Sequence, residues 1–454
     1  MKPAGVDEIL VDRLPGETRA ALLLQGRLVS LIVARPGQAS LVGAVIRGRV
    51  TAVRRDQGAA YVEIGADKAG FLSLRRGAKP PVQGASLTVQ VTKDAAGDKG
   101  AGLTDRPLIQ GRFLTLRPGQ PGLERSRRLA PEVFAGVTKA LKDVDATRVG
   151  FIANPAAEGA ADAALQAEAK ALAASWAAAE KRAGTPARLL PAPDPLLRAV
   201  LDHAASLRSV VLDDAGALNA LRAGIEELAP EAAALLAHHA GPAPLFRRRD
   251  VEAQIEAALA RRVRLKGGAA LTMDEIDALT VIDVDLAEQI SAGDWERAAL
   301  AANLEAAEEI ARQIRLRDIG GIGVVDFLRL SRPEHRRRVV EALRRASSGD
   351  PQQVDVLGMT PAGLVELTRR RGRPSLKQLA SGPLAQGFAL LRAAMDAAAA
   401  RPGRGLKARA APAVVEALEG EAASLAHARA RIAAGLELVV EPAHPALGFE
   451  IGPA

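Results

Sequence analysis

Between residues 259 and 378, short runs typical of β-strands alternate with longer runs typical of helices. The segment "TVIDVD" (280–285) is followed by an amphipathic pattern over 294–321 that ends in two glycines, a good helix terminus, and then by "GIGVVDF" (321–327). Strands that alternate with helices predict an α/β layer in this region. Residues 361–372, "PAGLVELTRRRG", are predicted to form another helix of that layer.

The rest of the chain should form further units, because 454 residues exceed what one hydrophobic core ordinarily holds. Residues 7–34 have short apolar runs around a "QG" turn, which predicts a β-meander or hairpin. Residues 41–105 contain five short strand-like runs punctuated by glycine, which suggests a small barrel. Residues 436–454 are predicted to form a terminal hairpin. Aromatic residues make up only 2% of the chain, so the cores must be built largely from Ala, Leu, Val and Ile.

Three acids stand at the ends of the two predicted strands. Asp283 and Asp285 alternate with apolar residues and therefore share one face of their strand, and Asp326 lies near the end of the next one. A right-handed strand–helix–strand unit brings such strand ends together, at the edge where ligands bind in α/β sheets. Oxygen ligands without His or Cys suit magnesium or manganese. The alternative is that these aspartates cap loops or pair with arginines.

The barrel segment carries two of the few aromatic residues. Tyr61 and Phe71 fall within eleven residues of each other, and aromatics on such a barrel stack single-stranded bases. Lys93 and Lys99, on the following strand and turn, are positioned to contact phosphates. The alternative is that Tyr61 and Phe71 belong to the barrel core.

The charge balance leans toward a polyanionic partner. There are 61 basic and 53 acidic residues, a net charge of +8, although a basic protein without such a partner would have the same composition. Runs of arginine recur along the chain and make a polyanion groove plausible, although such runs are usually solvated helix faces. These runs are Arg125 with Arg127 and Arg128, Arg247–Arg249, Arg261 with Arg262, Arg336–Arg338, and residues 369–373.

Several classes of protein are excluded by composition. The chain has no cysteine, which rules out disulfides, thiol nucleophiles and cysteine-ligated zinc, and its six histidines show no zinc-binding spacing. The first residues lack the apolar run of a signal peptide, and no segment has the roughly eighteen uninterrupted apolar residues of a membrane span. We therefore expect a cytoplasmic protein.

Together these segments resemble the ribonuclease E/G family of bacterial endoribonucleases, and its ribonuclease G branch more than its ribonuclease E branch. Residues 48–72 look like the RNA-binding domain of that family, 244–285 and 303–327 are close to its catalytic signature, and 411–442 resemble its C-terminal domain. The long catalytic signature is highly specific.

The resemblance implies an α+β multidomain fold. The implied domains are a ribonuclease-H-like domain (1–39 and 197–258), an inserted OB-fold RNA-binding barrel (40–105), an inserted sensor-like domain (106–196), a deoxyribonuclease-I-like α/β catalytic domain (259–378) and a small C-terminal α+β domain (379–454).

The activity implied is magnesium-dependent cleavage of single-stranded RNA, with manganese as a possible ion, leaving 5′-phosphate and 3′-hydroxyl ends, in rRNA processing or mRNA decay. Asp283 and Asp326 match the two magnesium-ligating aspartates of the family. Asp285 matches a catalytic position where the family usually carries Asn, so it adds negative charge beside the ion. That charge would either tighten the ion or repel the scissile phosphate.

The RNA-contacting positions are partly kept. Tyr61 and Phe71 match the stacking aromatics of the family, and Lys99 matches its channel lysine. Family members sense the 5′-monophosphate of RNA with an Arg-Thr pair, but Asn154 and Pro155 stand at those places here. We expect this sensor to be lost and the preference for 5′-monophosphorylated RNA to be small.

Two other departures concern partners. The CPxC zinc-link of the family should fall near residues 377–388, which read "KQLASGPLAQGF", so a zinc-bridged dimer is excluded, although a homodimer without zinc is still expected. The long disordered tail that organises degradosomes is missing, so we do not expect a scaffold for other decay enzymes. No membrane partner is expected either, because no segment has the apolar length of a membrane span.

A second reading is kept open. With Asp285 changed and the sensor lost, the chain would be a catalytically weakened RNA-binding protein of the same fold. A DNA-directed phosphodiesterase is disfavoured by the RNA-type barrel.

Overall fold

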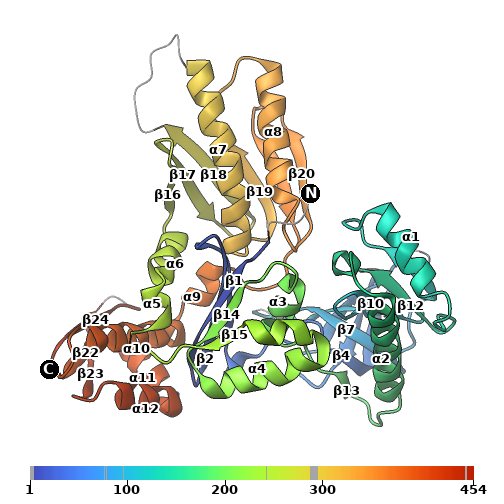
Figure 1. The fold of residues 1–454 in the computed structure, drawn as a ribbon, viewed down its shortest axis with the longest axis horizontal. Helices are drawn as coiled ribbons and strands as arrows, with labels where there is room; N and C mark the ends of the chain where they lie inside the picture. The colour runs from blue at the N-terminus through green and yellow to red at the C-terminus, as the bar shows by residue number, and fades with distance from the viewer. Residues whose placement is uncertain are drawn as a thin grey trace. The chain divides into compact units, whose positions relative to one another are not determined.

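The computed structural model describes residues 5–75, 77, 79–95, 97–241, 243–286, 295–444 and 447–454. The chain divides into two compact units (Figure 1). The first comprises Met1–Gln38, Ser206–Glu226 and Pro230–Ala454, and the second comprises Ala39–Ala205 with Glu227–Ala229. The second unit is thus an insertion into the first. None of the helices within the described residues is long and apolar enough to cross a membrane.

The first unit begins with a five-stranded sheet in the order β15-β14-β1-β2-β3. The strands are β1 (Glu8–Leu14), β2 (Glu17–Leu24), β3 (Arg27–Ala34), β14 (Ser209–Leu212) and β15 (Leu236–His238). The first three are antiparallel, which confirms the predicted meander, and the turn at Gln25 and Gly26 has positive φ at both residues. β14 and β15 run parallel to β1. The helical segments of this part are α4 (Ala215–Leu228), η3 (Pro230–Leu235), α5 (Leu245–Arg248) and α6 (Val251–Leu259).

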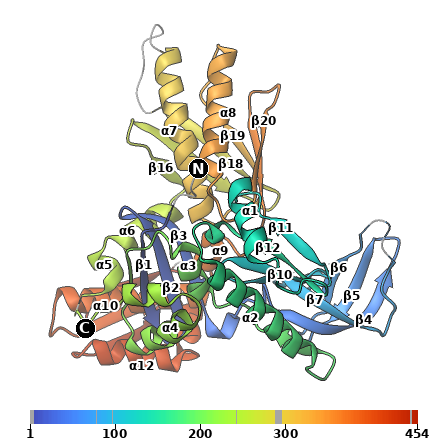
Figure 2. The same ribbon diagram turned by 45° about the vertical axis from the view of Figure 1, so that its right-hand side comes forward.

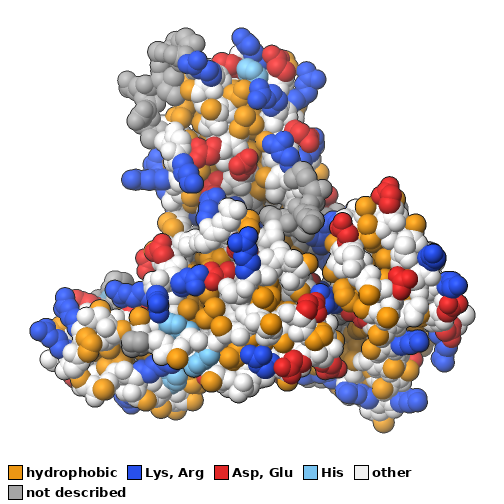
Figure 3. Space-filling model, in the orientation of Figure 1, with side chains coloured by type: hydrophobic (Ala, Val, Ile, Leu, Met, Phe, Trp, Pro, Cys, Tyr) orange, Lys and Arg blue, Asp and Glu red, His pale blue; other side chains and the backbone are white. Residues whose placement is uncertain are grey.

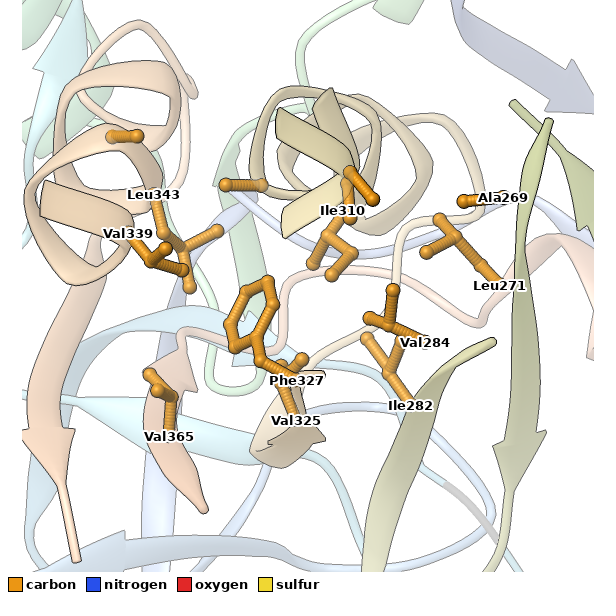
Figure 4. Close-up of a cluster of buried hydrophobic side chains, with 14 of the residues drawn as sticks. Ala269, Leu271, Ile282, Val284, Ile310, Val325, Phe327, Val339, Leu343 and Val365 are labelled. Carbon is orange, nitrogen blue, oxygen red and sulfur yellow. The ribbon is translucent and has the colours of Figure 1, made fainter. Parts of the chain in front are cut away.

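A six-stranded sheet in the order β16-β17-β18-β19-β21-β20 forms the predicted α/β layer. Its strands are β16 (Arg262–Arg264), β17 (Ala269–Glu275), β18 (Leu279–Leu286), β19 (Gly321–Asp326), β20 (Val354–Met359) and β21 (Val365–Arg369). Two long helices, α7 (Trp295–Leu316) and α8 (Pro333–Ser347), cover one face. Ile310 of α7 and Val339 and Leu343 of α8 pack against Ile282 and Val325 of the sheet (Figure 4).

The helix predicted over residues 361–372 is wrong, because this segment contains β21. Val365, Leu367 and Arg369 are buried and alternate with more exposed residues, which is the period of a strand. β21 pairs with β19 on one side and β20 on the other. The partner strands β19 and β20 come earlier in the chain, so the sequence of residues 361–372 alone, with its arginine-rich end, does not reveal the pairing.

The predicted terminal hairpin is also wrong. The last two strands, β23 (Leu436–Val440) and β24 (Phe449–Pro453), do not pair with each other, because β22 (Leu406–Ala410) lies between them. β22 is parallel to β23 and antiparallel to β24. The helices of this part are α9 (Leu376–Ala380), α10 (Pro383–Ala400), α11 (Pro412–Glu419) and α12 (Ala422–Arg431).

The second unit contains the predicted small barrel (Figure 2). β4 (Val45–Arg54), β5 (Ala59–Glu63), β6 (Gly70–Ser73), β8 (Gly102–Thr104) and β7 (Ser86–Lys93) follow one another, and pairing of β4 with β7 closes the ring. Its core consists of small and branched aliphatic side chains, as the composition requires. β13 (Ala187–Leu190) extends the sheet beside β4.

The remaining part of the second unit is a four-stranded sheet in the order β11-β12-β10-β9. Its strands are β9 (Ile109–Gln110), β10 (Leu114–Pro118), β11 (Gly122–Arg125) and β12 (Val149–Ala153). The helical segments are η1 (Pro36–Gln38, in the chain leading to this unit), α1 (Pro131–Ala140), η2 (Pro155–Ala157), α2 (Asp162–Glu180) and α3 (Pro195–His203). α2 is the alanine-rich helix that the sequence indicates, and Trp176 anchors it in the core of this part.

Candidate active site

The acids at the strand ends lie on the face of the six-stranded sheet opposite to α7 and α8. Ile282, Val284 and Val325 point into the core under the helices (Figure 4). Because side chains alternate along a strand, Asp283 and Asp326 point to the other side. β18 and β19 are parallel, and Asp283 is the direct register partner of Asp326. The register of β18 and β19 therefore brings these two carboxylates next to each other.

Asp285 lies two residues further along β18, on the same face. It stands opposite Ala270 of β17, where it has no cross-strand acid beside it. Asp283 and Asp285 are half-buried and Asp326 is exposed. On the helix-free face Val281 is 39% exposed and Ile322 50%, so the acids are accessible to a large ligand.

The electrostatics of the three acids are unfavourable without a cation. Burial raises the pKa of Asp283 above its ordinary value, and repulsion from Asp285 and then from Asp326 raises it further. A positive charge between these carboxylates would remove that repulsion.

The donor set fits a magnesium-type ion. Across the residues that the structure describes, no three His, Asp or Glu side chains are arranged to hold a metal by themselves. Asp283 and Asp326 offer two carboxylates, and magnesium is usually held by one or two carboxylates together with water and substrate phosphate. The residues present therefore suit an ion that is shared with a phosphate substrate.

Sequence reasoning missed a residue that holds the chain after Asp326. Asn303 of α7 is fully buried; its Oδ1 accepts from Leu328 N at 3.0 Å, and its Nδ2 donates to Leu328 O at 2.8 Å. Trp295 Nε1 donates to Arg329 O at 3.1 Å. The signal was available, since Asn303 interrupts the apolar face of an amphipathic helix.

A charged residue in the first turn of α7 secures the same segment. Glu296 accepts hydrogen bonds from Ser331, Arg332 and His335. The Ser331 bonds, from hydroxyl and backbone N–H, lower the pKa of Glu296 to about 2 and the His335 bond contributes. The chain from Asp326 to α8 is thus tied to α7 at several points.

Three of the candidate RNA-binding residues, Tyr61, Phe71 and Lys93, form a row on the outside of the barrel. Tyr61 of β5 pairs with Phe71 of β6, and their rings meet edge to face at 6.0 Å. Phe71 pairs in turn with Gly102 of β8, and Gly102 pairs with Lys93 of β7. Phe71 is 41% exposed, and neither aromatic belongs to the barrel core. The alternative that they are core residues is therefore wrong.

Lys93 and Lys99 are both exposed. Gly102 has no side chain, so the row has a gap between the Phe71 ring and the Lys93 side chain. Two aromatic rings followed by a lysine are the elements of a single-strand binding surface.

At the expected sensor positions, Asn154 is hydrogen-bonded within the protein. Asn154 Oδ1 accepts from Thr115 Oγ1 at 3.0 Å, and its Nδ2 faces Arg112 O at 3.4 Å. Pro155 begins the short helix η2. No cationic side chain stands at either position.

The arginine runs differ in how far their side chains are buried or paired with acids. Arg369 is buried between Asp350 and Asp318, so this run is not wholly a solvated face. Arg249 and Arg261 pair with single acids. Arg336–Arg338 are exposed on α8, and Lys and Arg side chains are seen around the end of that helix (Figure 3).

Comparison with known proteins gives one consistent family. The sequence profile of the ribonuclease E/G family matches residues 108–372. The chain is 32% identical to ribonuclease G of Escherichia coli (strain K12), covering 98% of this chain and 99% of the relative. It is 31% identical to ribonuclease G of Salmonella typhimurium over the same shares, and 32% identical to ribonuclease E of Haemophilus influenzae over 79% of this chain and 41% of that relative.

Proposed function

This chain belongs to the ribonuclease E/G family, and we propose that it is an endoribonuclease that cuts single-stranded RNA with a divalent cation held by Asp283 and Asp326. The observation that carries the proposal is the register pairing of these two aspartates on the exposed, helix-free face of the sheet. Magnesium is the expected ion and manganese an alternative. The products would carry 5′-phosphate and 3′-hydroxyl ends, and the process would be rRNA processing or mRNA decay in the cytoplasm.

The residues would divide the work as follows. A bound cation would polarise the scissile phosphate and lower the pKa of an attacking water. Asp283 and Asp326 would hold that ion. The two hydrogen bonds between Asn303 and the backbone of Leu328 would keep the segment after Asp326 in place. Asp285 would add a negative charge beside the site. Its effect on rate depends on whether it interacts more strongly with the ion or with the phosphate.

The barrel would hold the substrate strand. Tyr61 and Phe71 would stack two bases, and Lys93 and Lys99 would contact phosphates. Each such phosphate contact makes binding weaker as salt rises.

We assign residues 40–105 as the RNA-binding domain, 259–378 as the catalytic domain, 106–196 as a sensor-like domain, 1–39 with 197–258 as ribonuclease-H-like, and 379–454 as the small domain.

The proposal is tested by cleavage of a 5′-labelled, A/U-rich single-stranded RNA with magnesium. Asp283→Asn and Asp326→Asn should each still bind RNA but lose cleavage. Asp355→Asn is the matched control, because Asp355 is an exposed acid on β20 of the same sheet. If the wild type binds RNA and does not cut it with magnesium or manganese, the chain is the weakened RNA-binding protein.

Self-association is a separate proposal. We expect a homodimer that forms without zinc, since the chain has no cysteine to bridge one. Light scattering measures this directly, and a monomer that cleaves RNA at full rate would contradict it.

A further inference from the structure

A cavity of about 250 Å³ lies inside the first unit, away from the acids of the candidate active site. It opens to solvent on one side and is lined by residues of β2 and β3 and of helices α6, α9 and α10. Leu31, Ile255, Leu379 and Phe449 contribute to its apolar wall. Charged side chains make up much of the rest of the wall, and the volume is large enough only for a small ligand.

Helix α10 creates the space. Ala385, Ala389 and Ala393 recur every four residues, so they lie on one face of the helix, and all three line the cavity. Larger side chains at these positions would fill it. Arg392 and Asp396, also four residues apart, bring charge to the same wall.

Most of the charged groups in the wall already have partners. Glu17 accepts from Arg392 at 2.5 Å and from Arg35 at 2.7 Å, one bond to each carboxylate oxygen. Arg19 binds both carboxylate oxygens of Glu252. These pairs leave little capacity for another ligand.

Asp396 is different. Its side chain is only 17% exposed, and its one ion-pair partner within the described part of the chain is Arg247, at 3.9 Å, too far for a hydrogen bond. Burial raises its pKa to about 6, and repulsion from Glu252 contributes. Asp396 is thus a largely buried carboxylate with unused acceptor capacity, which a cation can satisfy.

The balance of charge in the wall favours a cation. Four carboxylates line the cavity, from Glu17, Glu252, Glu256 and Asp396, against three guanidinium groups from Arg19, Arg35 and Arg392, and Arg247 lies 3.9 Å from Asp396. The three guanidinium groups of the wall are already bonded to Glu17 and Glu252 and are not free to bind an anion, and a neutral apolar molecule would leave Asp396 unsatisfied.

We propose that this cavity binds an aliphatic primary amine, with the ammonium group on Asp396 and the alkyl chain along the alanine face of α10. The ammonium group has three donors and matches the free oxygens of the carboxylate. The alkyl chain replaces water against Leu31, Ile255 and Phe449. This site is independent of the nuclease proposal and uses none of its residues.

The test is calorimetric titration of the full chain, without RNA or metal, with n-butylamine, n-butanol and butyrate as probes. These three share a chain of similar size and differ in charge. We expect one amine to bind per chain, at least tenfold more tightly than the alcohol, with no binding of butyrate.

Two variants locate the site. Asp396→Asn keeps the shape and removes the charge, so the preference for amine over alcohol should fall to about one. Ala393→Leu fills the cavity and should abolish binding of both. Asp355→Asn on β20 is the charge-matched control and should bind as the wild type does.

The proposal is overturned if the wild type shows no saturable binding of the amine, or if Asp396→Asn keeps the preference for it. Equal binding of amine and alcohol to the wild type would also overturn it, because the cavity would then be only apolar. If the wild type binds the amine but does not cleave RNA, only the nuclease proposal is refuted.

Discussion

Arg369 offers a sharp test of how the catalytic sheet is held together. This side chain is 3% exposed and lies between two acids. Its Nε and Nη2 donate to Asp350 at 2.9 and 3.2 Å, and its Nη1 donates to Asp318 at 2.7 Å. We predict that Arg369→Met destabilises the six-stranded sheet strongly, because it leaves the equally buried Asp350 carboxylate without a cation.

The magnitude follows from what remains after the substitution. Breaking a buried pair costs about 3–5 kcal/mol. Asp318 keeps Arg373 at 3.0 Å, and Asp350 keeps one backbone donor, Gln352 N, at 2.8 Å. We therefore expect the lower end, about 3 kcal/mol, which is roughly a hundredfold in the equilibrium constant for opening, at about 1.4 kcal/mol per factor of ten.

The assay should report on this sheet rather than on the whole chain, because a protein of several units need not unfold in one step. Hydrogen exchange of the β19 and β21 amides measures the local opening free energy. Arg370→Ala is the control: Arg370 is the next residue, it is exposed, and its loss should cost less than about 0.5 kcal/mol.

A double variant checks the reasoning. Arg369→Met with Asp350→Leu removes both charges, so much of the lost protection should return. If Arg369→Met exchanges no faster than Arg370→Ala, the buried pair does not stabilise the sheet, and the argument from burial is refuted.

Other predictions concern pH and RNA. Burial, with repulsion from Asp12, raises the pKa of Asp213 from 3.8 to about 7, so the folded state holds a proton that the unfolded state has lost and stability falls as pH rises through this window. Asp213→Asn should match the wild type near pH 4 and be more stable at pH 8 in thermal melts; parallel pH profiles would contradict this. Phe71→Ala should weaken single-stranded RNA binding by roughly 5- to 150-fold, from about 1–3 kcal/mol of stacking, without loss of fold, and fluorescence anisotropy with a labelled RNA would show an unchanged affinity if the ring does not stack. With Asn154 and Pro155 at the sensor positions, cleavage rates on matched RNAs with 5′-monophosphate, 5′-triphosphate and 5′-hydroxyl ends should be similar, and a large monophosphate preference would show that another residue senses the end.

The sequence by itself determined the features that depend on local periodicity. Asp283 and Asp285 share a face because strand side chains alternate, and the single long helix before Asp326 implies a parallel neighbouring strand. The meander at the N-terminus and the small barrel follow from short alternating runs separated by glycines. Each of these patterns is written within a few dozen consecutive residues.

Only the tertiary structure decided the features that depend on distant partners. Val365, Leu367 and Arg369 form a strand because they pair with β19 on one side and β20 on the other. Arg369 can be buried because it forms ion pairs with Asp318 and Asp350. β22 separates β23 from β24, so adjacency in sequence did not become pairing. The cavity beside Asp396 likewise arises between segments far apart in the chain. The physical reason is common to all of these features: pairing and burial are properties of contacts, and a local pattern specifies which side of an element is apolar but not which element will cover it.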